Sequence, residues 1–283
     1  MNRAFPQPRL VLLATALLAA IAAPCAAQTC EYEVKAVSYG NLVAHLYLPL
    51  MPSPMPVVVA VGGSDGGMSF GDANGELLAP HCLAVLGLAY FKADGLPSTL
   101  DAIPLEYLNT AIDYLETVPE VDSARLGMVG GSRGAELALV FAAIEPRIRS
   151  VVVTTPSSHV WGGRTSNESA WTLGGKHVPH LSLASTLEVP QVKRFEEALD
   201  RAGPESIARI PVENIKGPIM LISAMEDAVW PSFRMSLDIE STLHKARFPF
   251  EVRHASYPTG HGFSKETAPR IKQTIIDHFV QTL

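Results

Sequence analysis

The segment that most constrains the fold is Gly-Gly-Ser-Arg-Gly at residues 130–134, which satisfies the pattern G-x-S-x-G. It stands between a strand-like segment, 124–129, and an alanine- and leucine-rich segment, 135–144, with helical character. A strand that enters such a turn and a helix that leaves it form a nucleophile elbow, in which flanking glycines let the backbone turn sharply. The same letters also occur in ordinary turns. The strand and helix around them favour the elbow and predict that Ser132 projects its hydroxyl from the edge of a sheet.

Strand-like and helix-like segments alternate along most of the chain. A hairpin pattern covers 32–48, short apolar strands are expected at 56–61, 88–91, 124–129, 148–154, 218–223 and 250–257, and helices at 75–86, 104–115, 135–144, 232–243 and 265–282. Strands that alternate with helices indicate an α/β protein. With the elbow, they predict the α/β-hydrolase fold: a mostly parallel central sheet with helices on both faces and strand-end loops along one edge.

The alternation stops between residues 156 and 215, and this stretch is too long for an ordinary connection. It contains two tryptophans, several glycines and one helical pattern at 192–202. We expect it to form a cap over the strand-end loops rather than a separate domain. Residues 28–283 are therefore predicted to form a single domain with a cap insertion.

A serine hydroxyl needs a base to remove its proton, and in this fold the acid and the histidine follow later strands of the sheet. Of nine histidines, only His261 stands between two glycines directly after a predicted strand, 250–257. A histidine on a surface loop is the alternative. Glu226 and Asp227 follow the preceding strand, so the chain order of serine, acid and histidine is the required one. Adjacent side chains point in different directions, so only one of the two carboxylates can reach the imidazole, and the spacing leaves open which.

Two backbone N–H groups are expected to bind the oxyanion that forms during acyl transfer. One belongs to Arg133, at the N-terminus of the helix that follows the elbow. The other should come from the glycine-rich loop 62–67, where the Ser64 amide is our first choice and Gly63 the second. A phosphate-binding loop is the rival interpretation, but the Lys-Ser/Thr pair that such a loop requires does not follow.

Two residues are further candidates for the substrate pocket, and two for a metal site. Gly63 and Trp230 are expected near the reacting atoms, although Trp230 fits an ordinary core position equally well. His177 and His180 are three residues apart, which resembles half of a metal site. No cysteine or carboxylate cluster in the sequence completes that site, so we predict no metal and no organic cofactor.

The first 27 residues have the tripartite pattern of a secretory signal. A basic start precedes an apolar run at 10–23, which is short for a membrane span, and small residues precede position 28. We expect cleavage there and an exported protein, periplasmic or secreted, without stable membrane insertion; a retained N-terminal anchor is the alternative. Cleavage would leave Cys30 and Cys82, which either form a disulfide or remain two free thiols.

The charge of the chain argues against a nucleic-acid partner. The formal net charge is −6, with a sequence pI of about 5.8, so no basic field attracts a polyanion. The expected partner is a small molecule.

Several stretches resemble one known family. They are Leu88-Ala89-Tyr90-Phe91, Ile103-Pro104-Leu105-Glu106-Tyr107, the elbow with Gly134-Ala135-Glu136-Leu137, Trp171 with Gly175 and Val178-Pro179, Ile210-Pro211-Val212-Glu213-Asn214-Ile215, Gly217-Pro218-Ile219, Ser223 to Asp227 with Trp230-Pro231-Ser232, and Tyr257-Pro258 with Gly260-His261. Together they resemble the acyl-CoA thioesterases and the bile acid-CoA:amino acid N-acyltransferases, and more distantly the dienelactone hydrolases. The likeness covers roughly 57–262.

The resemblance implies a role for each matching residue. It places the nucleophile on Ser132, the acid on Asp227 rather than Glu226, and the base on His261. The N-acyltransferases of the family use a cysteine nucleophile, so serine here favours hydrolysis. The expected activity is hydrolysis of acyl esters or acyl thioesters through an acyl-enzyme. The alternatives are an acyltransferase that moves the acyl group to an amine or alcohol, and a non-catalytic binding protein on the same scaffold.

Overall fold

The computed structural model describes residue 1 and residues 29–52, 54–183 and 188–283. The predicted signal peptide falls on residues that lie, after Met1, outside the described ranges, so it stays a prediction. Within those ranges, no helix combines the length and the apolar character that crossing a membrane requires.

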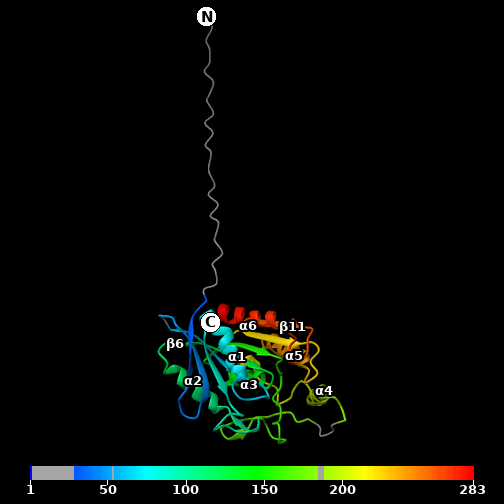
Figure 1. The fold of residues 1–283 in the computed structure, drawn as a ribbon. Helices are drawn as coiled ribbons and strands as arrows, with labels where there is room; N and C mark the ends of the chain where they lie inside the picture. The colour runs from blue at the N-terminus through cyan, green and yellow to red at the C-terminus, as the bar shows by residue number, and fades with distance from the viewer. Residues whose placement is uncertain (2–28, 53, 184–187) are drawn as a thin grey trace.

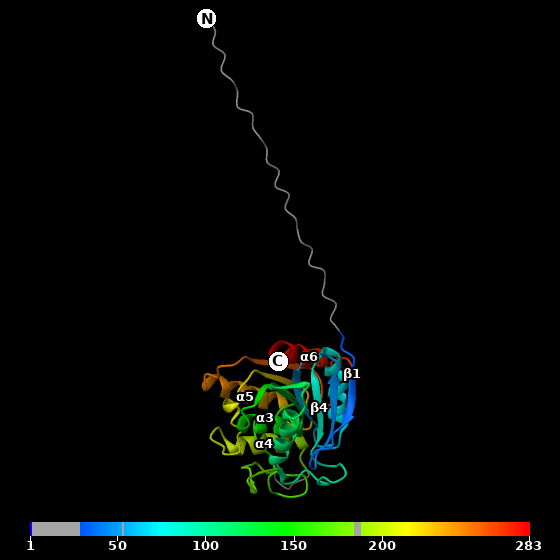
Figure 2. The same ribbon diagram turned by 90° about the vertical axis from the view of Figure 1, so that its left-hand side faces the viewer.

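Eight strands of the described chain form the central sheet, in the order β1-β2-β4-β3-β6-β7-β10-β11. Their bounds are β1 Tyr32–Ala36, β2 Val43–Pro49, β3 Met55–Val61, β4 Ala84–Ala89, β6 Val121–Gly131, β7 Ile148–Thr154, β10 Ile219–Ala224 and β11 Val252–Tyr257. Strand β2 is antiparallel to both of its neighbours, and all other neighbouring pairs are parallel. Figure 2 shows β1 at one edge of the molecule and the strands stacked away from it. This order and pairing is the α/β-hydrolase fold, and the prediction of fold class is confirmed.

Helices cover both faces of the sheet because successive side chains of each buried strand point to opposite sides. Val58 and Ala60 of β3 belong to the cluster that contains α1 (Ser69–Leu78) and α6 (Ala268–Thr282). Val57 and Val59 belong to the opposite cluster, which three helices complete. These helices are α2 Glu106–Glu116, α3 Arg133–Ile144 and α5 Ser232–Lys245. Figure 1 shows α6, in red, along the side of the molecule away from α3.

The structure contains the helix predicted at 75–86 and the strand predicted at 88–91, but the predicted bounds were wrong. Helix α1 begins at Ser69 and gives way to a short 3₁₀ helix, η1, at Ala79–His81, and β4 starts at Ala84. Cys82, which has a left-handed backbone with φ of 63°, ends η1. The early start of α1 depends on close packing, since a Cβ on Gly71 would lie 2.7 Å from the Cα of Gly87 in β4. Gly71, which precedes the predicted start of the helix, therefore lets α1 approach the sheet.

The described part of the predicted cap region contributes two strands to a small second sheet and contains one further helix. The sheet has the order β5-β8-β9 and consists of β5 Ile103–Pro104, β8 Trp171–Leu173 and β9 Lys176–His177. Helix α4 covers Gln191–Ala202, and a 3₁₀ turn, η2, covers Val212–Asn214. Because Ile103–Pro104 pairs with β8, the predicted helix at 104–115 starts two residues later, at Glu106.

A disulfide joins Cys30 to Cys82, with 5.4 Å between their Cα atoms. The backbone N–H of Cys30 also donates to the carbonyl of Pro80 at 2.8 Å. The start of the sheet is thus fastened to the segment between η1 and β4, and the two cysteines are not free thiols.

Candidate active site

The turn from β6 into α3 has the geometry of a nucleophile elbow. Ser132 has φ of 53° and ψ of −119°, a left-handed conformation that costs energy for a residue with a Cβ. The glycines around it allow a close approach of backbone. A Cβ on Gly130 would lie 2.1 Å from the carbonyl oxygen of Gly134, and a Cβ on Gly134 would lie 2.3 Å from that of Gly62. Only glycine fits at these two positions.

Three side chains at the carboxyl edge of the sheet form a hydrogen-bonded series. Ser132 follows β6, Asp227 follows β10, and His261 follows β11. The Nε2 atom of His261 lies 2.9 Å from the Ser132 hydroxyl, and its Nδ1 atom lies 2.9 and 2.8 Å from the two carboxylate oxygens of Asp227. The structure thus brings together the three residues that the sequence selected.

The carboxylate of Asp227 is held in place by the chain that follows it. Its side chain is 1% exposed, and Oδ1 accepts the backbone N–H groups of Val229 at 3.0 Å and Trp230 at 3.2 Å. Glu226 is exposed, and its backbone N–H donates to the carbonyl of Thr259. Asp227, rather than Glu226, is therefore the carboxylate that faces the imidazole.

Of the two predicted oxyanion donors, one adjoins Ser132 in the chain and the other belongs to a loop that lies against Ser132. Arg133 is the first residue of α3, and Ser64 lines the same cavity as Ser132. A Cβ on Gly63 would lie 3.0 Å from the Cβ of Ser132 and 3.6 Å from its hydroxyl oxygen, so this loop runs against the nucleophile. The Tyr90 hydroxyl donates to the Gly62 carbonyl at 2.6 Å. Burial raises the pKa of Tyr90 above its usual value, so the phenol keeps the proton that it donates.

A cavity of about 1080 Å³ opens at Ser132 and His261. Aromatic rings form one side of it in an edge-to-face series. Trp161 packs against Phe195 of α4 with 4.5 Å between ring centroids, Phe195 against Trp230 at 5.8 Å, and Trp230 against His261 at 5.9 Å. Trp230 is 1% exposed, and its indole N–H donates to the Thr155 carbonyl at 3.1 Å. Trp230 is both a core residue and a wall of the cavity, so the two alternatives that the sequence left open both hold.

The two cap histidines make separate contacts. His177 Nε2 lies 3.0 Å from a Glu168 carboxylate oxygen, and His180 Nε2 lies 2.8 Å from the Asn167 carbonyl. Among the residues that the structure describes, no three His, Cys, Asp or Glu side chains come together as a metal site would require.

Sequence reasoning missed the residues that join the cap to the elbow. Glu136, Trp161 and Phe195 were not selected as functional candidates, yet the first is fully buried under the cap and the other two line the cavity. One signal was available. Glu136 is an acidic residue in a helix that is otherwise almost entirely apolar, and a buried carboxylate needs partners.

Comparison with known proteins identifies relatives by sequence and by fold. Residues 103–280 match the family described as BAAT / Acyl-CoA thioester hydrolase C terminal. The mitochondrial acyl-coenzyme A thioesterase 2 of Homo sapiens is 31% identical over 198 residues, 69% of this chain and 40% of the human protein. The peroxisomal succinyl-coenzyme A thioesterase of Mus musculus is 28% identical over 228 residues, 80% of this chain and 53% of the mouse protein. The chain spans about half or less of the length of these relatives.

Solved structures share the fold at low sequence identity. Carboxyl esterase 2 of Tuber melanosporum has a TM-score of 0.62 and 18% identity, covering 90% of this chain and 88% of its own. A putative dienelactone hydrolase from Klebsiella pneumoniae has a TM-score of 0.59 and 15% identity, covering 89% and 98%. These likenesses concern the fold alone. The family match covers well over half of the sequence, and the chain belongs to the BAAT / acyl-CoA thioester hydrolase C-terminal family.

Proposed function

We propose that the protein is a serine hydrolase that cleaves acyl esters or acyl thioesters through an acyl-enzyme on Ser132. The observation that carries this proposal is the hydrogen-bonded series from the Ser132 hydroxyl through His261 to the buried Asp227 carboxylate, at the mouth of a large cavity. The family of the chain supports it, because relatives that match are named as thioesterases.

The geometry supports a two-step acyl transfer. His261 Nε2 accepts the proton of the Ser132 hydroxyl as its oxygen attacks the acyl carbonyl carbon. The oxyanion is bound by the backbone N–H groups of Arg133 and Ser64. When the carbonyl re-forms, the bond to the leaving group breaks, and the imidazolium returns the proton to the leaving oxygen or sulfur. Water then enters, loses a proton to the same nitrogen and attacks the acyl carbon. The bond from this carbon to Ser132 Oγ breaks, the imidazolium returns the proton to Oγ, and the free acid leaves, while Asp227 holds the imidazole in one orientation throughout.

The charges around the cavity favour a negatively charged substrate. The chain has 22 basic and 28 acidic residues, yet the charged side chains that line the cavity are mostly basic. The acidic one is Asp65, and the basic ones are Arg164, Arg194, Lys272 and Arg133, of which Arg133 is balanced by Glu136. A local excess of positive charge in an acidic protein concentrates anions at that site. An acyl thioester with phosphate groups on its leaving group, or an acyl group with a second carboxylate, has this character.

The test is the variant Ser132→Ala, assayed with nitrophenyl esters and with acyl-CoA thioesters, with the products identified. Wild-type protein that releases free acid, and a variant at background rate, would support the proposal. A variant that retains near wild-type turnover would exclude Ser132 as nucleophile. Transfer of the acyl group to an added amine or alcohol in preference to water would assign the protein to the acyltransferases.

Export is part of the same proposal. The disulfide between Cys30 and Cys82 supports it, because such bonds persist in oxidising compartments and are rare in the cytosol. Fractionation of cells that express the full chain, with the N-terminus of the mature protein sequenced, tests it. Recovery of the protein in the cytosol with residues 1–27 attached would contradict it.

A further inference from the structure

A buried ion pair lies in the first turn of α3, directly after the nucleophile Ser132. Arg133 and Glu136 stand one helical turn apart at the start of α3, with side chains 9% and 0% exposed. Arg133 Nη1 lies 3.0 Å from Glu136 Oε2 without hydrogen-bond alignment, so Coulomb attraction rather than a directed hydrogen bond joins these two atoms. Burial raises the pKa of Glu136 above its usual value, and the Arg133 charge opposes that rise.

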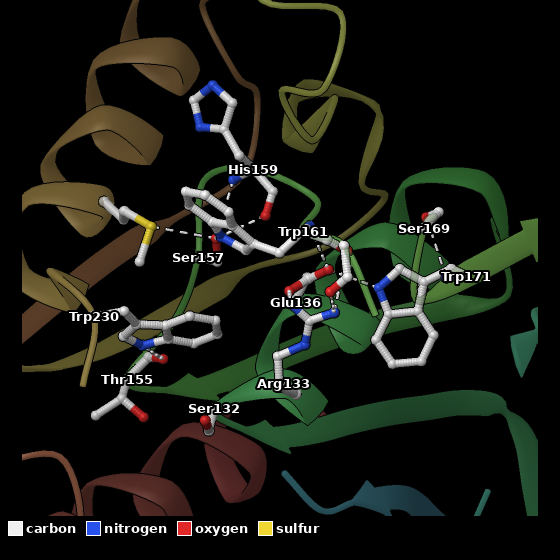
Figure 3. Close-up of polar contacts among 12 residues, drawn as sticks. Ser132, Arg133, Glu136, Thr155, Ser157, His159, Trp161, Ser169, Trp171 and Trp230 are labelled. Carbon is white, nitrogen blue, oxygen red and sulfur yellow. Dashed lines mark hydrogen bonds and ion pairs between the residues drawn. The ribbon is translucent and has the colours of Figure 1, made fainter. Parts of the chain in front are cut away.

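Both members of the pair bind the same stretch of the cap. Glu136 Oε1 accepts the backbone N–H of Trp161 at 3.0 Å and the indole N–H of Trp171 at 2.7 Å. Arg133 Nη2 donates to the carbonyls of Trp161 at 3.2 Å and Gly162 at 3.1 Å. Figure 3 shows Glu136 between the Arg133 guanidinium, the Trp161 backbone and the Trp171 indole. The backbone N–H and the carbonyl of Trp161 are thus both hydrogen-bonded to side chains of α3.

The segment that this pair holds forms part of the cavity wall. Trp161, Gly162 and Gly163 all line the cavity that contains Ser132. The Trp161 indole is fixed a second time, because its N–H donates to the Ser157 hydroxyl at 2.7 Å. A displacement of Trp161 would pass to Phe195, against which it packs.

Stability alone does not account for such a pair. Two buried charges lose their hydration, and well-packed apolar residues of similar volume often stabilise a protein as well or better. Apolar residues, however, cannot form directed hydrogen bonds. The four hydrogen bonds from Arg133 and Glu136 to defined backbone and indole groups specify one position of the cap. Among the residues that the structure describes, neither the Glu136 carboxylate nor the Arg133 guanidinium forms a hydrogen bond or ion pair with the side chains of Ser132, His261 or Asp227.

We propose that Arg133 and Glu136 are positioning residues, whose side chains fix cap residues 161–163 over the nucleophile elbow and so set the part of the cavity that receives the acyl chain. The proposal rests on the proposed hydrolase function and adds a determinant of substrate size to it. A substrate with a short acyl group reaches Ser132 without using the cap wall. A substrate with a long acyl group depends on where that wall stands.

The main test compares nitrophenyl acetate with nitrophenyl decanoate in the variant Glu136→Gln, which keeps an acceptor for both tryptophan donors and removes the charge. We expect KM for decanoate to rise by about tenfold, because small displacements of positioning groups have effects of this size or larger, while kcat for acetate changes far less. Glu197→Gln, at an exposed position on α4, is the matched control and should change neither. Equal losses on the two esters would overturn the proposal.

A double variant separates positioning from stability. If Glu136→Gln reduces the folded yield, Arg133→Met combined with Glu136→Met removes both charges and leaves no unpaired one. We expect this double variant to be more stable than either single variant, with KM for decanoate still raised. Recovery of wild-type KM together with stability would show that the pair has a structural role only.

Hydrogen exchange provides a readout that does not need activity. The Trp161 amide donates directly to Glu136, and a neutral Gln oxygen accepts this bond more weakly than a carboxylate does. Peptides covering 157–163 should therefore exchange faster in Glu136→Gln, and peptides of β7 should not. Trp171→Phe removes one donor and no charge. It should also speed the exchange of these peptides, by a smaller factor. Unchanged exchange would contradict the proposal. A wild-type protein without esterase or thioesterase activity would contradict the proposed function and leave the exchange result as the test of the cap.

Discussion

The backbone of Trp230 binds the Asp227 carboxylate while its side chain packs against the imidazole that this carboxylate orients. The N–H of Trp230 donates to Asp227 Oδ1 at 3.2 Å, and its indole meets the His261 ring at 74° with 5.9 Å between centroids. One residue thus restrains both partners of the His261–Asp227 hydrogen bonds. The orientation of Asp227 is thus fixed before substrate binds, as electrostatic catalysis requires.

The first prediction concerns the charge of that carboxylate. Asp227→Asn keeps the shape of the side chain but offers His261 Nδ1 an uncharged partner and permits the wrong tautomer. We expect kcat to fall by about three to four orders of magnitude, the loss typical of this substitution in a serine–histidine–aspartate triad. Steady-state hydrolysis of nitrophenyl acetate measures it. Glu226→Gln, one residue away and exposed, is the control, and a comparable loss there would mean that the acid is misassigned.

The second prediction concerns the elbow. In Gly134→Ala the new Cβ would meet the carbonyl oxygens of Gly62 and Val61 at 2.3 and 2.4 Å, and neither backbone group can move without disturbing the loop next to Ser132. We expect a loss of at least about 2 kcal/mol in the free energy of unfolding, with a loss of turnover. Urea denaturation measures the first quantity. Gly260→Ala, whose Cβ would find its nearest neighbour at 3.8 Å, should unfold like the wild type.

The sequence was sufficient for the fold and the site residues because their signals are local or ordered along the chain. Ser132 stands in a pattern that couples a strand to a helix, and this coupling requires glycine at fixed positions. Asp227 and His261 each follow an apolar strand of a parallel sheet, so topology alone brings them to the same edge. The choice between Glu226 and Asp227 needed the family resemblance, because two adjacent carboxylates differ only in the direction of their side chains.

What the sequence did not predict depends on contacts between distant segments. The start of α1 was misplaced because it depends on the close packing of Gly71 in α1 against Gly87 in β4, which no local pattern reveals. Glu136 was overlooked because its partners, Trp161 and Trp171, lie 25 and 35 residues away in the cap. The pairing of Cys30 with Cys82 was left open for the same reason, since 52 residues separate them.

The third prediction concerns that disulfide. A bond that closes a loop of 52 residues restricts the unfolded chain, and the loop-entropy relation gives a stabilisation of about 4 kcal/mol. We expect reduction with dithiothreitol, or the double variant Cys30→Ser with Cys82→Ser, to lower the unfolding free energy by that order. Activity at 25 °C should persist, because the bond lies at the opposite end of α1 from the loop that contains Ser64. Equal urea midpoints for oxidised and reduced protein would contradict the prediction.

The fourth prediction concerns acid stability. His278 of α6 is 2% exposed, and burial, assisted by Arg253 and opposed by Glu251, lowers its pKa from 6.5 to about 4. As the pH falls below 6.5, His278 takes up a proton in the unfolded chain but stays neutral in the folded protein. Stability is therefore lost between pH 6.5 and about 4 and then levels off. The difference corresponds to about 3 kcal/mol. His278→Gln, which does not titrate, should reduce the dependence of the unfolding free energy on pH over this window, and the buried His159, whose pKa is also lowered to about 4, should account for a further part. The exposed His244→Gln serves as control, and identical slopes for the two variants would show that His278 does not carry the effect.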